Sequence, residues 1–289
     1  MRFSCLHTHT LFCDGHDDIE TFCRAALEKG LVSLGFSAHA PLPPESGLVT
    51  DWHLPPGRLA GYLEAVRAAA RRWAGRIPVY LGLEADYITG RTGPASLVYP
   101  ALGLDYLIGS VHYILPPDGG EPFAVDSSPE ILAGNIGAHF GGDGEALMEC
   151  YWEAVSEMCR AGGFDILGHL DLVKKSNGAL HFFDESGPRY RRASGAALDA
   201  AARAGVVVEI NTGGMNRGWI REPYPSGQLL KMLAARDIPL CLNADAHRAA
   251  DLDGHYTEAL AAARDAGCRS LQLFNGSQDR WEREALEPF

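Results

Sequence analysis

Short apolar runs alternate with longer amphipathic segments along almost the whole chain. Strand-length apolar runs followed by segments of helical spacing are typical of repeated βα units. The predicted strands are Phe3–Leu6, Val32–Phe36, Ile77–Leu83, Tyr106–Ile108, Ile166–Leu167, Val206–Ile210 and Pro239–Leu242. The predicted helices cover residues 18–29, 57–74, 144–161, 189–204, 226–236 and 254–266. This pattern predicts an α/β fold with a parallel sheet, of which the (β/α) barrel is one form.

Two further segments complete the predicted fold. The run Ser270–Phe274 is either an eighth strand or an edge segment, and the stretch from Pro116 to Gly144 is interpreted as a long loop over the barrel mouth. In the first helix, Asp17 or Asp18 is the expected N-cap and Gly30 the stop. Because α/β barrels commonly reach 289 residues as one unit, we expect a single domain over residues 1–289.

Charge and cysteine content restrict the class of protein. The formal net charge of −12 argues against nucleic-acid or anionic-membrane partners, which need basic patches. The seven cysteines are scattered and odd in number, which indicates reduced thiols in a cytoplasmic protein. Bound divalent cations would let such an acidic chain bind an anionic phosphate. The sequence does not indicate an oligomeric state.

Metal-binding residue types gather directly after the predicted strands. The set comprises His7, His9, Asp14, His39, Glu84, His112, His169, Asp245 and His247. The carboxyl ends of barrel strands form the face on which active sites are built. Six imidazoles and three carboxylates at that face are enough for a cluster of three metal ions. Nitrogen and oxygen ligands without thiolates suit zinc, manganese or iron, and the sequence does not choose among them.

Each signal also has an ordinary structural explanation. His7 and His9 lie on one side of an extended strand and could bind one cation, but they could also be polar residues at a strand end. Glu84 ends a buried strand, where a carboxylate needs a cation or a path into solvent. His112 and His169 could be hydrogen-bonded core histidines. The conjunction of all these residues at one face favours the metal cluster.

The residues resemble the polymerase and histidinol phosphatase (PHP) superfamily, and within it the stand-alone histidinol-phosphate phosphatases. The supporting segments are His7–Thr10, Gly35–Pro41, Gly82–Ile88, Gly109–His112, Gly168–Lys175, Glu209–Thr212, Tyr224–Ser226 and Asp245–His247. The first and last of these are shared across the superfamily. Residues 84–88, 168–175 and 209–226 indicate the histidinol phosphatase branch. The resemblance implies a distorted (β/α)7 barrel, TIM-like, that hydrolyses L-histidinol phosphate in histidine biosynthesis.

The resemblance also implies how three divalent metals are shared among the ligands. The implied sets are His7, His9, Glu84 and Asp245 for one metal, Glu84, His112 and His169 for the second, and His39, His247 and a residue of the loop after His9 for the third. Many relatives have a histidine at the position of Gly15. Asp14 is the preferred substitute here, and His16 is the reserve.

Phosphomonoester hydrolysis needs a strong nucleophile and cations around the phosphoryl oxygens. We expect attack by a hydroxide formed from water between two metals, with Glu84 bridging them and Asp245 or His247 protonating the leaving group. Arg217 is the first choice for binding the phosphate, although an exposed loop arginine is the ordinary explanation. Lys174 and Lys175 are second choices for binding the phosphate, and Asp86, Tyr87 and Glu222 could form the rim that binds the rest of the substrate. Trp52, Trp219 and Tyr224 could line the pocket. We expect structural or surface roles for the remaining histidines, His53, His139, His181 and His255.

Three rival functions remain open. A PHP phosphoesterase could act on another small phosphomonoester or on nucleotide phosphodiesters, although the acidic balance counts against polymeric substrates. An amidohydrolase also starts with two histidines spaced by one residue, but Glu84 and Asp245 fit that family poorly. A non-catalytic metal-binding barrel would be expected to have lost ligands.

Overall fold

The computed structural model describes residues 1–276 and 280–286 and contains a sheet of seven parallel strands. The strands lie in the order β1-β2-β3-β4-β7-β8-β9. Their bounds are β1 (Ser4–Cys5), β2 (Ser33–Phe36), β3 (Val79–Asp86), β4 (Tyr106–Ser110), β7 (Ile166–Leu167), β8 (Val207–Asn211) and β9 (Leu240–Asn243). All seven predicted strands are confirmed, with bounds that differ by at most three residues.

The two outer strands of this sheet approach each other and nearly close it into a barrel. Thr8, just after β1, forms a parallel bridge with Ala246, just after β9. The side-chain Oδ1 of Asn243 accepts a hydrogen bond of 2.8 Å from the backbone N–H of Leu6. A side chain thus replaces part of the missing strand ladder. The predicted distorted (β/α)7 barrel is confirmed.

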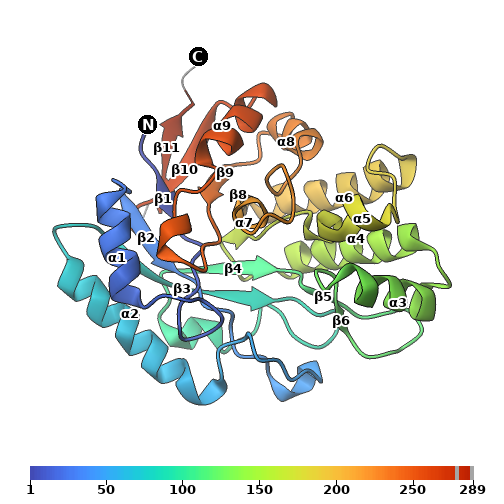
Figure 1. Cartoon of the computed structure of the whole chain (residues 1–289), viewed down its shortest axis with the longest axis horizontal. Helices are drawn as coiled ribbons and strands as arrows, with labels where there is room; N and C mark the ends of the chain where they lie inside the picture. Colours follow the sequence, from blue (N-terminus) through green and yellow to red (C-terminus); the bar gives the residue numbers. More distant parts are fainter. Residues whose placement is uncertain (277–279, 287–289) are drawn as a thin grey trace.

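The helices lie outside the strands (Figure 1). Their bounds are α1 (Ile19–Glu28), α2 (Leu59–Trp73), α3 (Pro129–Phe140), α4 (Gly144–Ala161), α5 (Asn177–Leu180), α6 (Pro188–Ala204), α7 (Gly213–Asn216), α8 (Gly227–Ala234) and α9 (Tyr256–Asp265). The Asp18 side chain caps α1 by accepting from the N–H of Thr21, and Gly30 follows the helix with a positive φ of 72°. In the part of the chain described here, no helix is long and apolar enough to cross a membrane.

The amino-terminal half of the barrel interior is packed around Tyr106. Its hydroxyl donates to the carbonyl of Leu6. The ring fills space left by two glycines on neighbouring strands, because a Cβ at Gly35 or at Gly82 would lie 2.4 Å from an atom of Tyr106. Phe274 lies against Tyr106 with ring centroids 5.7 Å apart. This end of the barrel is therefore closed by aromatic side chains.

The structure corrects one prediction about a connecting segment and decides between two alternatives that were left open for another. Residues 116–144 are not one long loop, because α3 lies within them, capped by Ser128, started by Pro129 and ended by Gly141 in a left-handed conformation. The stretch also includes β6 (Phe123–Ala124), which pairs antiparallel with β5 (Tyr113–Ile114). The run Ser270–Phe274 forms β10, which pairs antiparallel with β11 (Trp281–Ala285) in a separate two-stranded sheet. It is not an eighth barrel strand.

Candidate metal centre

All nine residues selected from the sequence converge at the carboxyl-terminal mouth of the barrel. Six barrel strands deliver them: β1, β2, β3, β4, β7 and β9. Glu84 is the only one of the nine that lies within a strand; the other eight follow strand ends. Parallel strands bring their carboxyl ends to one edge, so side chains up to 240 positions apart (247 − 7) meet there.

Glu84 lies at the centre of this group and contacts imidazoles from four other strand ends. Its Oε2 lies 3.2 Å from His7 Nε2 and 2.8 Å from His39 Nδ1. Its Oε1 lies 3.0 Å from His169 Nε2 and 3.6 Å from His112 Nε2. The two carboxylate oxygens therefore face different sets of histidines. This arrangement suits a carboxylate that bridges two cations.

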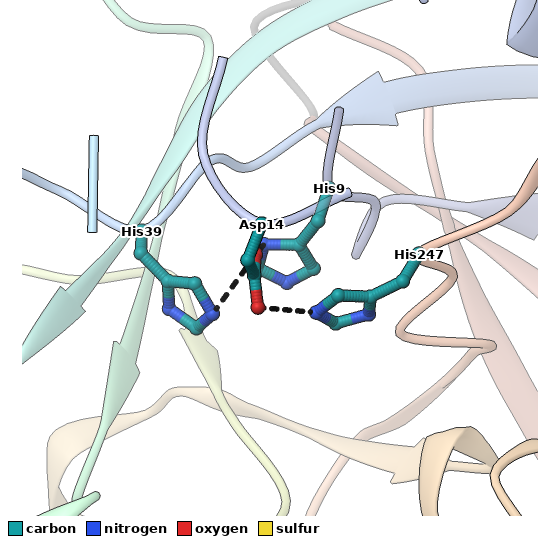
Figure 2. A group of neighbouring side chains, drawn as sticks. All are labelled: His9, Asp14, His39 and His247. Carbon is teal, nitrogen blue, oxygen red and sulfur yellow. Dashed lines mark hydrogen bonds and ion pairs between the residues drawn. The ribbon is translucent and has the colours of Figure 1, made fainter. Parts of the chain in front are cut away.

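Asp14 and three histidines form the outer part of the centre (Figure 2). Asp14 Oδ2 lies 3.0 Å from His247 Nε2, and its Oδ1 lies 3.8 Å from His39 Nε2 and 3.7 Å from His9 Nδ1. The imidazole of His9 is stacked between those of His39 and His247, with ring centroids 4.2 and 4.3 Å away. Four ligand atoms from three loops thus face a common space.

The structure favours Asp14 over His16 in this outer group. A Cβ at Gly15 would lie 2.2 Å from the carbonyl oxygen of His9, so no side chain fits where relatives were expected to have histidine. His16 is exposed, and its backbone N–H donates to the carbonyl of His247. Asp14 instead directs its carboxylate into the cluster.

Three groups of ligand atoms could each hold a metal ion, and they overlap differently from the sets implied by the resemblance. The groups are His9, Asp14, His39 and His247; His7, His9 and Asp245; and His39, Glu84 and His112. His9 and His39 each belong to two groups. His169 approaches the cluster through Glu84. Because the groups share ligands, binding a metal at one group would also engage side chains of a neighbouring group.

Several buried atoms in this cluster have no hydrogen-bond partner among the described residues. They include Nε2 of His7 and of His9, Oδ1 of Asp14 and Oε2 of Glu84. Buried polar atoms are nearly always satisfied, so orphaned nitrogen and oxygen atoms pointing into one space indicate a missing partner. Divalent cations that accept mixed nitrogen and oxygen ligands fit this donor set.

The electrostatic surroundings keep Glu84 and His9 in the forms that bind metals, whereas nearby carboxylates raise the pKa values of His7, His39 and His112, which must lose a proton when they bind a metal. Burial alone would raise the pKa of Glu84, but the imidazoles of His7, His39 and His112 hold that pKa well below its usual value. Burial and the neighbouring imidazoles of His39 and His247 together lower the pKa of His9 to about 3. Glu84 is therefore a carboxylate and His9 a neutral imidazole, the protonation states required of ligands.

Two buried carboxylates behind the cluster orient histidines, and neither role was predicted. Glu209 in β8 has its Oε2 3.0 Å from Nδ1 of His7, and Asp86 at the end of β3 has its Oδ1 2.8 Å from Nδ1 of His112. Each carboxylate accepts the Nδ1–H and so directs the Nε2 lone pair to the cluster. Asp86 is thus not a substrate rim residue. Glu209 stood in the sequence as a charged residue inside an otherwise apolar strand, which is the signal that could have identified it.

Arg217 follows α7 and reaches into the mouth. Its Nη2 donates to Asp245 Oδ2 at 2.8 Å, and its Nη1 donates to His247 Nδ1 at 2.7 Å. The guanidinium is held within the site rather than exposed in a loop. It lies beside the cluster, where it could contact a bound anion.

The two lysines predicted to bind phosphate have different surroundings. Lys174 is buried away from the mouth and pairs with Asp171 at 3.1 Å and Glu222 at 3.2 Å. Lys175 donates from Nζ to the carbonyl of Asp126 at 2.5 Å, at the edge of the site. The predicted rim residues lie elsewhere: Glu222 pairs with Lys174, and the hydroxyl of Tyr87 donates to Glu157.

Of the remaining aromatic residues and histidines considered in the sequence, some lie at the site and others lie outside it. Trp52 and Trp219 line the site cavity, whereas Tyr224 is buried beneath it. His53 is buried, and its Nε2 lies 2.7 Å from Asp86 Oδ2, which supports Asp86 from behind. The other three lie outside the centre, His139 in α3 and His181 and His255 at helix ends.

A cavity of about 340 Å³ opens onto the cluster. Its walls are formed by seven of the nine predicted ligands, Arg217 and a set of loop residues: Trp52, Ala124, Asp126, Ser127, Leu172 and Trp219. This volume is in the range of small-molecule sites. The metal-binding atoms are therefore reachable by a small ligand.

Residues 6–213 match the family model of the PHP domain. The chain belongs to the PHP family. It is 33% identical over 267 residues to a probable histidinol-phosphatase of Deinococcus radiodurans, which covers 92% of this chain and 94% of the relative. It is 27% identical over 262 residues to a histidinol-phosphatase of Bacillus subtilis, covering 86% and 95% of the two chains.

Solved structures of PHP-type phosphatases share the fold. A putative histidinol phosphatase, HisK, of Listeria monocytogenes superposes with a TM-score of 0.77 at 23% identity, covering 88% of this chain and 99% of the other. The histidinol phosphate phosphatase of Lactococcus lactis, solved with zinc, L-histidinol and phosphate, gives a TM-score of 0.65 at 18% identity over 97% and 99% of the two chains. The PHP barrel therefore extends over most of this chain.

Proposed function

We propose that this chain is a metal-dependent phosphomonoesterase that hydrolyses L-histidinol phosphate to L-histidinol and phosphate. The observation that carries the proposal is the position of Glu84, whose two carboxylate oxygens face imidazoles from four other strand ends at the floor of a small-molecule cavity. The names of the two curated relatives, which cover most of the chain, support the substrate.

Three divalent metal ions, zinc, manganese or iron, would be held by the nine clustered side chains. The ligands in this proposal are His7, His9, Asp14, His39, Glu84, His112, His169, Asp245 and His247. Bound metals would lower the pKa of a water molecule and neutralise the phosphoryl oxygens. Glu209 and Asp86 would fix the orientation of their histidines before substrate arrives.

Protein groups beside the metals would complete the reaction. Arg217 would bind a phosphoryl oxygen through its guanidinium, which is already positioned by Asp245 and His247. The leaving oxygen needs a proton, and Asp245 and His247 are our candidate donors because both lie at the cavity wall. Lys175 lies at the edge of the site and would assist in binding the phosphate. Lys174 instead forms ion pairs with Asp171 and Glu222.

The wider assignments rest on the same framework. We propose a single domain over residues 1–289, because one sheet runs from β1 to β9 and Arg2 pairs with Glu282 of β11 at 2.6 Å. The net charge of −12 supports small esters rather than nucleic acids or membranes as partners. Cytoplasmic location stays a prediction from the cysteine pattern.

A substrate screen tests the proposed function. The metal-loaded protein would be assayed for phosphate release from L-histidinol phosphate, other small phosphomonoesters and bis(p-nitrophenyl) phosphate, with Mn²⁺, Zn²⁺ or Fe²⁺ present. We expect the highest kcat/KM with L-histidinol phosphate and no release after chelation. A preference for the diester would contradict the proposal and favour a phosphodiesterase. Release that survives full chelation would exclude the metal mechanism.

A further inference from the structure

The cavity wall contains one carboxylate that does not belong to the metal cluster. Asp126 is the only acidic residue outside the cluster among the described residues that line the cavity. The loops bearing Trp52 and Trp219 form walls of the same cavity. The cavity wall thus combines the guanidinium of Arg217, the carboxylate of Asp126 and two indole rings, and the Trp219 ring also packs on Arg217 at 4.5 Å.

The β5–β6 hairpin determines the direction in which Asp126 points. Tyr113 pairs with Ala124, and the N–H of Val125 donates to the carbonyl of His112 at 2.8 Å, so the extended pairing continues past the end of β6. Side chains alternate along an extended strand. Val125 is fully buried, whereas Ala124 and Asp126 on either side of it both line the cavity.

Lys175 contacts both the backbone carbonyl and the carboxylate of Asp126. Lys175 Nζ donates to the carbonyl oxygen of Asp126 at 2.5 Å, while it lies 3.6 Å from Oδ2, beyond a good hydrogen bond. The Asp126 side chain is 26% exposed. Its carboxylate therefore faces the cavity, partly desolvated and able to accept hydrogen bonds from a ligand.

The indole walls provide flat apolar surface beside this carboxylate. Trp52 is stacked on Tyr113, with centroids 5.6 Å apart and an interplanar angle of 11°, and its ring edge meets His39. Trp219 is 47% exposed, and Lys175 Nζ lies 3.6 Å from its ring centroid. Both rings are held by neighbours, so they offer preformed surfaces to an aromatic ligand.

We propose that Asp126 binds the ammonium group of an aminoalkyl phosphomonoester and thereby sets the substrate preference of the site. The inference rests on the proposed function and deepens it. With the phosphate at the metals and Arg217, an amine on the carbon chain of the ester would lie in the same cavity of about 340 Å³ that Asp126 lines. A charge-assisted hydrogen bond to Asp126 would make the amino ester bind more tightly than an otherwise identical ester without the amine.

Two substrates and three variants test this assignment. The kcat/KM values for L-histidinol phosphate and for its des-amino analogue, 3-(imidazol-4-yl)propyl phosphate, would be measured in the wild-type protein and in Asp126→Asn, Asp126→Glu and Asp118→Asn. In Asp126→Asn we expect the ratio of the two values to fall by about 10- to 100-fold. The loss should appear mainly in KM for the amino ester. Asp126→Glu should recover part of the ratio because it restores the charge.

Asp118 is the matched control, because it is an exposed carboxylate in the same connection and pairs with His139 instead of the cavity. Its variant should keep the wild-type ratio. A ratio that stays at the wild-type value in Asp126→Asn would overturn the assignment of Asp126 alone. A wild-type protein that hydrolyses both esters equally well would overturn both this assignment and the proposed substrate.

Discussion

The two ends of one barrel interior differ in how their polar atoms are satisfied. At the amino-terminal end, the polar atom of Tyr106 donates to a backbone carbonyl and apolar rings fill the remaining space. At the mouth, Glu84 and its histidines are also buried, yet ligand atoms such as His9 Nε2 have no hydrogen-bond partner among the described residues. Burying such atoms is costly unless something binds them. We infer that the amino-terminal end of the barrel stabilises the fold, whereas polar atoms at the mouth are positioned to bind metals.

Glu84→Gln should cause the largest loss of activity. Removing the central negative charge should lower phosphate release by on the order of 1000-fold, equivalent to about 4 kcal/mol of transition-state stabilisation. The melting temperature of the metal-free variant should fall below that of the metal-free wild type, because the histidines that lower the pKa of Glu84 stabilise its charge in the folded protein. Steady-state kinetics and thermal melts measure both. Activity within tenfold of wild type would contradict the assigned role of Glu84.

Phe274→Ala should destabilise the amino-terminal end of the barrel. Phe274 is 3% exposed and lies against Tyr80 and Tyr106 with centroid distances of 4.8 and 5.7 Å, so its truncation leaves a cavity. We expect a loss of about 3–5 kcal/mol in the free energy of unfolding. Urea denaturation measures the loss, and metal affinity of the folded protein should stay unchanged. Equal losses of metal affinity and stability would remove the distinction between the two ends.

Glu209→Gln should weaken metal binding without removing a ligand. The variant keeps the side-chain volume but loses the negative charge that fixes the Nδ1–H of His7. We expect metal affinity to fall by about 10- to 100-fold, measured by competition with a chelator. Glu258→Gln, an exposed carboxylate on α9, is the control and should leave affinity unchanged. An unaltered affinity in Glu209→Gln would show that the carboxylate has no orienting role.

Asp18→Ala should have the smallest effect of these variants, and it compares an exposed helix-capping carboxylate with the buried carboxylates of the mouth. Asp18 caps α1, and the N–H of Thr21 lowers its pKa in the folded protein. The stabilisation is therefore present above the unfolded pKa of about 3.9 and is lost as pH falls through the lower folded value. We expect the variant to lose about 1 kcal/mol at pH 7 and less near pH 2. Urea titrations at both pH values measure it. An equal cost at both would contradict the capping role of the carboxylate.

The sequence predicted the fold and the gathering of the site residues because both depend on strand ends. The ends of strands can be predicted from short stretches of sequence, and the barrel fold brings them together regardless of loop conformation. The orienting bond between Glu209 and His7 could not be predicted, because it joins side chains 202 positions apart, one on β8 and one just after β1. The preference for Asp14 over His16 came from the resemblance, and the structure adds the physical reason: Asp14 faces the cluster and His16 is exposed.

The errors in connecting segments have local causes. Glycine and acidic residues suggested a loop around α3, although Ser128 and Pro129 form a clear helix start. The partner of β10 was missed because Trp281–Ala285 is rich in charged residues and mostly exposed. A strand that pairs outside the core lacks the apolar pattern by which buried strands are recognised.

Metal content tests the central claim most directly. The wild-type protein and Glu84→Ala would be loaded with excess Mn²⁺ or Zn²⁺, dialysed and measured by elemental analysis, with circular dichroism to verify folding. We predict more than one divalent metal per wild-type chain and loss of most of it in the variant. A folded wild-type protein that retains less than one metal per chain, or a variant that retains the full wild-type content, would contradict the account.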